Sequence, residues 1–102
     1  MISVKVTYTV RKDFADQNKQ NIQRFLADFR ALARDDFRYT VYTTASGLTF
    51  IHHSLYRDEA IQQLLLQMPS FLAFQQQRDA SGLAATPQIE VLSLAGASHQ
   101  LL

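Results

Sequence analysis

The chain has 102 residues, 47% of them hydrophobic, with three glycines and two prolines, a composition that predicts one packed domain over 1–102 and excludes a disordered chain. Ten basic and nine acidic residues give a net charge of +1, without the basic stripe that nucleic-acid binding requires. The absence of cysteine excludes disulfides and thiolate metal sites. No apolar run reaches the ~20 residues of a membrane span, and no signal peptide is visible, so we expect a cytoplasmic protein without membrane contacts.

The first two predicted elements are a strand and a helix. Apolar residues alternate with polar ones over 2–10, and this period of two predicts a half-buried strand. The period then changes, because the apolar residues over 16–33 recur three and four positions apart, which predicts a helix of about five turns. Asp13 or Asp16 is expected to cap its start.

A hairpin and a second helix are predicted next. The segments 37–44 and 48–56 read as strands, joined by the turn residues of 45–47. Asp58 is suited to cap the helix that follows, and Pro69 should bend or restart that helix, with Ser70 as a candidate for the new cap. After a loop, 88–94 reads as the last strand.

The order β-α-β-β-α-β predicts an α+β, ferredoxin-like domain, a four-stranded antiparallel sheet with both helices on one face. The third strand must offer either its even or its odd residues to the other face. Both sets contain apolar or aromatic groups, and exposed groups of this kind mark interfaces. We therefore expect a homodimer in which the uncovered faces of two sheets meet.

The residues from Leu48 to Phe74 resemble the antibiotic biosynthesis monooxygenase family of the dimeric α/β barrel superfamily. The family has a strand that ends in a tryptophan, a short helix, and then a proline followed by two aromatics three apart. The matching residues in this chain are Tyr56, Asp58, Glu59, Ala60, Pro69, Phe71 and Phe74. The likeness in element order covers nearly the whole chain, and it implies the dimeric α/β barrel fold.

Four positions depart from the family pattern. Leu65 stands where family members often carry a histidine, and Thr7 stands where the haem-degrading members use an asparagine. Haem chemistry is therefore not expected. On the third strand, His52 and Tyr56 take the places of the asparagine and tryptophan that line the pocket in quinone-forming members.

The candidate site follows from this comparison. We expect a cavity between the uncovered face of the sheet and the second helix, lined by Thr7, His52, Tyr56, Phe71 and Phe74. His52 is the candidate base because imidazole titrates near neutral pH, and Tyr56 is the candidate anchor for a substrate oxygen. The alternatives are a histidine hydrogen-bonded within the protein and a tyrosine that binds a protein partner.

The resemblance implies a cofactor-independent monooxygenase that acts on a small aromatic substrate of the phenol or quinone type, with no cofactor and no metal. The sequence leaves two other functions open. One is a non-catalytic protein that binds a small molecule in the same pocket. The other is a dimeric interaction protein whose cavity is filled with side chains.

Overall fold

The computed structural model describes the backbone of residues 1–102 and every side chain except that of residue 81. Its elements follow the predicted order β-α-β-β-α-β, with the second helix in two pieces. In chain order they are β1 (Ile2–Thr9), the 3-10 turn η1 (Lys12–Phe14), α1 (Ala15–Ala31), β2 (Phe37–Thr43), β3 (Thr49–Tyr56), α2 (Glu59–Leu66), α3 (Pro69–Gln77), the π-helical turn η2 (Arg78–Gly82) and β4 (Gln88–Leu92).

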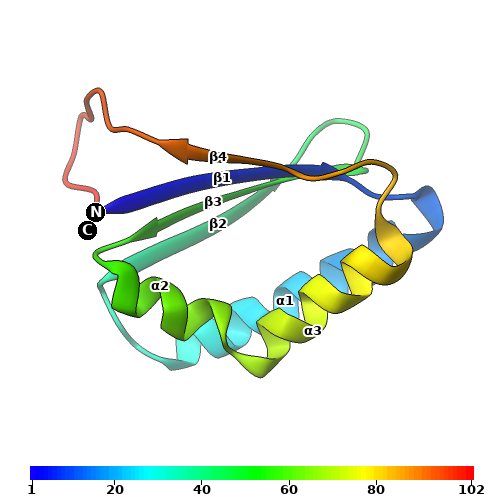
Figure 1. Cartoon of the computed structure of the whole chain (residues 1–102), viewed down its shortest axis with the longest axis horizontal. Helices are drawn as coiled ribbons and strands as arrows, with labels where there is room; N and C mark the ends of the chain where they lie inside the picture. The colour runs from blue at the N-terminus through cyan, green and yellow to red at the C-terminus, as the bar shows by residue number, and fades with distance from the viewer.

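The four strands form one antiparallel sheet in the order β2-β3-β1-β4. All three helices lie on the same side of this sheet (Figure 1). This arrangement confirms the predicted ferredoxin-like α+β fold. Within the described residues, no helix is both long and apolar enough to span a membrane.

Proline divides the second helix, and of the two predicted outcomes, a bend or a restart, the structure shows the restart. The helix α2 ends at Leu66, and Met68 adopts an extended backbone (φ −65°, ψ 136°) before Pro69 opens α3 as its first residue. Proline suits that position because its missing N–H would have no partner there in any case. The prediction of Ser70 as the cap is wrong, since Met68 holds the capping position.

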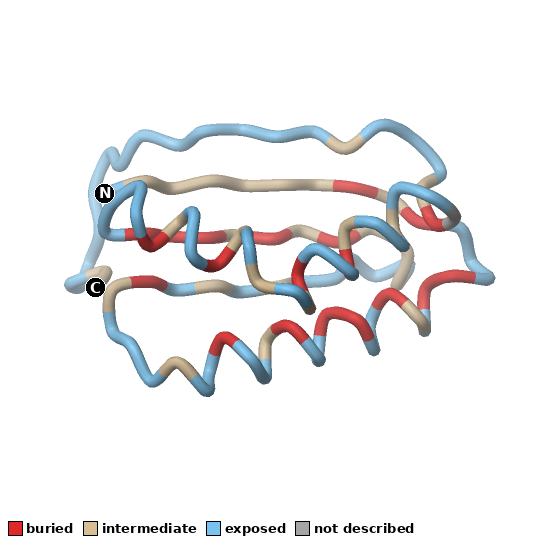
Figure 2. The backbone as a smooth tube through the Cα atoms, turned by 60° about the horizontal axis from the view of Figure 1, so that its bottom comes forward, coloured by how far each residue is buried: buried red, intermediate tan, exposed pale blue. Residues whose placement is uncertain are grey.

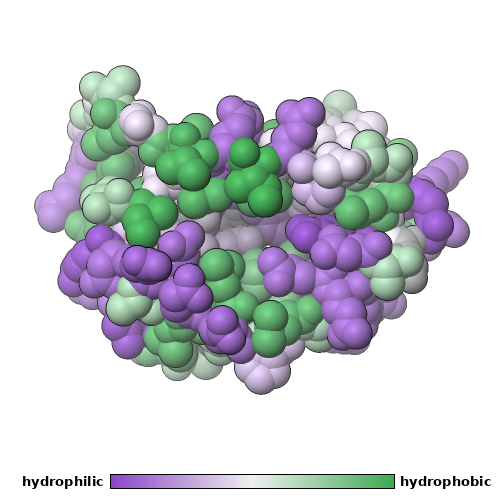
Figure 3. Space-filling model, viewed as in Figure 1, coloured by the Kyte–Doolittle hydropathy of each residue, from purple (hydrophilic) through white to green (hydrophobic). Residues whose placement is uncertain are grey.

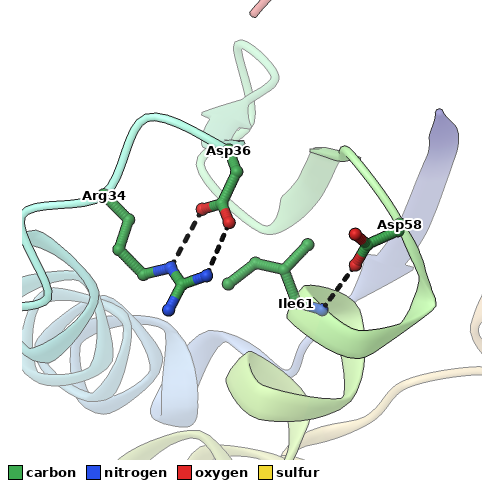
Figure 4. Close-up of polar contacts among 4 residues, drawn as sticks. All are labelled: Arg34, Asp36, Asp58 and Ile61. Carbon is green, nitrogen blue, oxygen red and sulfur yellow. Dashed lines mark hydrogen bonds and ion pairs between the residues drawn. The ribbon is translucent and has the colours of Figure 1, made fainter.

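Two local hydrogen-bond sets fix the ends of helices (Figure 4). The carboxylate of Asp58 accepts from the backbone N–H of Ile61 at 3.1 Å, which confirms the predicted cap of α2. After α1, Ala33 takes a left-handed backbone (φ 52°), and Arg34 donates two hydrogen bonds to Asp36, at 3.0 and 2.6 Å. The predicted acidic cap of α1 is wrong, because Phe14 takes that position without a side-chain bond.

The core is a cluster of aromatic side chains between the sheet and the helices. The even residues of β3 point toward the helices, and they meet the buried faces of α1 and α3 there. Phe25 is fully buried at the centre, with ring centroids 4.9 Å from Phe74 and 5.0 Å from Phe71. We call this set the aromatic core; its members are Tyr8, Phe25, Phe29, Tyr39, Phe50, Phe71 and Phe74, packed around His52.

The opposite face of the sheet has no helix over it (Figures 1 and 2). The register places Thr7 opposite Ile51 on one neighbouring strand and opposite Gln88 on the other, so all three belong to this open face. The sequence left open whether the odd- or the even-numbered residues of β3 lie on the open face. In the structure the odd-numbered residues lie on it, and the even-numbered ones face the helices. The open face is therefore more polar than it would be with Phe50 and Tyr56 exposed.

Truncating the centre of the aromatic core should destabilise the fold strongly. We expect Phe25→Ala to lower the free energy of unfolding by about 3–5 kcal/mol, because the change removes buried apolar surface and leaves a cavity. Urea unfolding followed by circular dichroism measures this effect. The control Leu72→Ala changes an exposed residue of α3 and should stay within about 0.5 kcal/mol of the wild type. Equal losses in both variants would contradict this account of the core.

Candidate functional site

A cavity of ≈ 870 Å³ opens between the sheet and the pair α2 and α3. It lies on the face that the helices cover, over β1 and β4. Short aliphatic side chains form its floor there, namely Val4, Val6, Ile89 and Val91. In the view of Figure 3 the surface is hollowed between the apolar atoms over β4 and the helices below. Ile89 and Val91 stay 70% and 77% exposed, so the mouth of the cavity is on the β4 side.

Four of the five residues that the sequence singled out line this cavity, namely His52, Tyr56, Phe71 and Phe74. Thr7 does not, and its predicted place in the pocket is wrong. Strand residues alternate between the two faces, so Thr7 points to the open face while its neighbour Val6 points into the cavity. The cavity was also predicted on the uncovered face of the sheet, which is wrong, because His52 and Tyr56 lie on the face that the helices cover.

His52 is held by protein groups on both ring nitrogens. Its Nε2 lies 2.7 Å from the hydroxyl of Tyr8, and its Nδ1 lies 2.8 Å from the hydroxyl of Tyr39. The side chain is 3% exposed. Burial, aided by the positive charge of Arg78, lowers its pKa from 6.5 to about 3. The imidazole is therefore neutral at neutral pH, and neither ring nitrogen is left without a hydrogen-bond partner.

The hydrogen-bond chain continues from Tyr8 into α1. Asn18, which is fully buried, donates from Nδ2 to the Tyr8 hydroxyl at 3.0 Å. Burial raises the pKa of both Tyr8 and Tyr39, so both hydroxyls keep their protons. Of the residues joined by these hydrogen bonds, His52 and Tyr39 line the cavity. The sequence did not single out Tyr39, because only the strand register, which pairs Val41 with His52, brings Tyr39 within reach of the imidazole.

Arg78 supplies a positive charge to the cavity wall, and the sequence did not reveal it. The polar run from Gln75 to Arg78 has the composition of a solvated helix face, yet both Gln75 and Arg78 line the cavity. The Arg78 side chain is 12% exposed, with its guanidinium carbon 5.1 Å from the ring centroid of Tyr8 and 5.3 Å from that of Phe74. The signal in the sequence that could have revealed Arg78 is its position four residues after Phe74, because residues four apart share one face of a helix.

The charge of Arg78 is only partly compensated. Its Nε lies 2.9 Å from a carboxylate oxygen of Asp79, whose side chain is 56% exposed. A mostly buried cation beside an exposed carboxylate can also attract an anionic ligand, because its interactions are less screened than those of a surface charge.

Burial raises the pKa of Tyr56, which therefore also offers a proton and not a negative charge. The described part of the chain contains no cluster of three or more histidine or acidic residues that could hold a metal ion.

The same fold occurs in solved structures of low sequence identity. Rv0793 from Mycobacterium tuberculosis is 19% identical, with a TM-score of 0.78 over 96% of this chain and 98% of that one. An antibiotic biosynthesis monooxygenase is 10% identical, with a TM-score of 0.78 over 94% of this chain and 100% of that one. SnoaB from Streptomyces nogalater, a cofactor-independent oxygenase, is 15% identical, with a TM-score of 0.71 over 97% of both chains.

The chain therefore has the fold of the antibiotic biosynthesis monooxygenases, as the resemblance implied. Comparison with protein-family models gives no match. Comparison with curated protein sequences gives no match either.

The buried imidazole should make stability depend on pH. Unfolding exposes a histidine with a pKa near 6.5, whereas folded His52 takes up its proton only near pH 3. Between these values the unfolded chain binds the extra proton, so the free energy of unfolding falls with decreasing pH, by up to ~1.4 kcal/mol per unit.

Urea unfolding from about pH 7 to about pH 5 measures that slope. The variant His52→Gln should lose this contribution, and the control His99→Gln, in the exposed tail, should keep it. The same slope in His52→Gln and in the wild type would contradict the assignment to His52.

Proposed function

We propose that this protein is a cofactor-independent oxygenase that acts on a small aromatic substrate of the phenol or quinone type, bound in the cavity as its oxygen anion. The observation that carries the proposal is the composition of the cavity wall. Aromatic and aliphatic side chains surround one mostly buried cation, Arg78, whose partner Asp79 is largely exposed, and hydroxyl groups that keep their protons. Such a wall favours a flat apolar ligand with one negative oxygen. The shared fold with SnoaB, an oxygenase without a cofactor, supports the same reading.

The proposed reaction needs only the substrate and dioxygen. Ionisation of the phenol raises the electron density of its ring. The ring transfers one electron to dioxygen, and a carbon–oxygen bond then forms between them. The peroxide anion that results takes a proton from water, which leaves hydroxide. The ring carbon gives its proton to that hydroxide, the O–O bond breaks, and a second hydroxide leaves, which takes up the proton released when the phenol ionised. The net change converts a phenol and O2 into a quinone and water. The protein stabilises the anion electrostatically and holds it in place.

The proposed roles differ from one predicted residue to the next. Phe71 and Phe74 form an apolar wall for the substrate ring. Tyr56 lines the cavity and is a candidate anchor for a substrate oxygen, as the sequence suggested. The contacts of His52 do not favour a role as base, because both nitrogens are engaged and its pKa is about 3. We assign His52 to positioning, so the substrate must ionise in solution or on entry.

Removing the charge of Arg78 should impair the reaction. We expect Arg78→Gln to lower kcat/KM by ~10-fold or more, because a hydrogen bond or ion pair with a charged partner is lost. Oxygen uptake with a panel of phenols and hydroxyquinones measures this effect. The control Arg30→Gln changes an exposed arginine of α1 that does not line this cavity and should leave uptake unchanged.

The panel also separates the alternative functions. Binding of a phenol without oxygen uptake would favour a non-catalytic binding protein. Neither binding nor uptake across the panel would overturn the proposal and favour an interaction protein.

We further propose a cytoplasmic homodimer in which two open sheet faces meet. Ile51 lies on the open face, and Tyr42 on the same face is 58% exposed. A second copy of the face would cover both residues and the unpartnered sheet.

The substitution Ile51→Asp should shift the protein toward a monomer, since it places charges against each other across a two-fold axis. Light scattering at micromolar concentration measures the mass. The control Leu72→Asp lies on the helical side and should remain dimeric. A wild-type monomer would contradict the proposed assembly.

A further inference from the structure

The chain of hydrogen bonds through His52 has a direction, and that direction can be read from the number of protons available. Asn18 donates to Tyr8, and the Tyr8 and Tyr39 hydroxyls contact opposite nitrogens of His52. A neutral imidazole carries one N–H and one lone pair, so it donates to one tyrosine and accepts from the other. Two arrangements are therefore available, and they differ in which tyrosine keeps a proton for another partner.

In the first arrangement Tyr8 donates to Nε2, and Nδ1–H donates to Tyr39. The Tyr8 hydroxyl then accepts from Asn18 and donates to His52, so its proton is satisfied. The Tyr39 hydroxyl accepts from His52 and has its own proton left over. Because Tyr39 lines the cavity, that proton can reach a ligand.

In the second arrangement every bond through the imidazole is reversed. Tyr8 then accepts from both Asn18 and His52, and its proton has no further partner among the described hydrogen bonds. Tyr8 is 2% exposed, and a buried hydroxyl proton without an acceptor is unfavourable. The first arrangement is the one that leaves the unpaired proton at the cavity and not in the core.

We infer that Tyr39 is the group that binds the substrate oxygen, donating a hydrogen bond whose direction is set by Asn18, Tyr8 and His52. This assignment rests on the function proposed above and adds to it the residue that holds the reacting oxygen. Tyr39 contacts the ligand itself, whereas Asn18, Tyr8 and His52 are positioning residues. Successive hydrogen bonds in one direction polarise each other, so the last donor is stronger than an isolated tyrosine.

The tautomer of His52 tests the direction without any substrate. Nitrogen-15 NMR of the labelled full chain distinguishes an Nδ1–H imidazole from an Nε2–H imidazole. We expect Nδ1–H in the wild type. In the variant Asn18→Asp a carboxylate replaces the amide that donates to Tyr8, so Tyr8 donates to it instead and accepts from His52, which should convert to Nε2–H, a change that a purely structural role would not produce. Nε2–H in the wild type would overturn the assignment, whatever the protein's activity.

Ligand affinity tests the role of Tyr39 itself. The probes are 4-nitrophenolate, which carries an oxygen anion, and nitrobenzene, which lacks that oxygen. Tyr39→Phe should weaken phenolate binding by about 10-fold, the usual effect of one hydrogen bond to a charged oxygen, and change nitrobenzene binding by less than about twofold. The matched control Tyr42→Phe makes the same change on the same strand, but on the open face, and should leave both affinities unaltered.

The outcomes separate this assignment from the oxygenase proposal. Loss of phenolate affinity in Tyr56→Phe with full affinity in Tyr39→Phe would overturn the role of Tyr39 and leave the oxygenase proposal intact. Selective loss of phenolate affinity in Tyr39→Phe, together with no oxygen uptake in any phenol assay, would support the role of Tyr39 and overturn the oxygenase proposal. Failure of the wild type to bind either probe would overturn both.

Discussion

The imidazole of His52, held between two tyrosine hydroxyls in an aromatic core, is the interaction on which the rest of the site depends. Its partners come from different elements, Tyr8 from β1 and Tyr39 from β2, and Asn18 of α1 extends the chain. A polar group buried in such a core must be hydrogen-bonded, and here both nitrogens are. The same ring stacks on Phe74 with centroids 5.3 Å apart, so the positions of three strands, α1 and α3 are set around one side chain.

A neutral, fully bonded histidine gives the cavity an unusual balance of groups. The tyrosines around it keep their protons because burial raises the pKa of each, and Arg78 remains charged beside two aromatic rings. Apart from the carboxylate of Asp79, which is paired with Arg78, and the amides of two glutamines, the groups of the wall that can contact a ligand oxygen are hydrogen-bond donors and one cation. A donor-rich, mostly apolar cavity stabilises an anion and is poorly suited to removing a proton. The preference for an ionised substrate follows from that balance.

The fold could be predicted from the sequence because it depends on local period. Alternation over 2–10 and the three-and-four spacing over 16–33 specify a strand and a helix on their own. The site depends on which residues meet across strands, and period alone cannot provide the register. Because of that gap, Thr7 and His52 were assigned to one face although they lie on opposite faces of the sheet, and Tyr39 and Tyr8 were not recognised as partners of His52. Arg78 was missed because a polar run on a helix usually faces solvent, whereas here the break at Pro69 sets α3 against the cavity.

The pKa of bound 4-nitrophenol tests most directly whether the cavity favours an oxygen anion. A spectrophotometric pH titration of the saturated complex gives this pKa, because only the phenolate absorbs strongly in the visible range. If Arg78 and the tyrosine donors act as described, binding lowers the pKa relative to that of the free phenol. A bound pKa above the free value would show that desolvation dominates, and it would contradict the account of the cavity as an anion site.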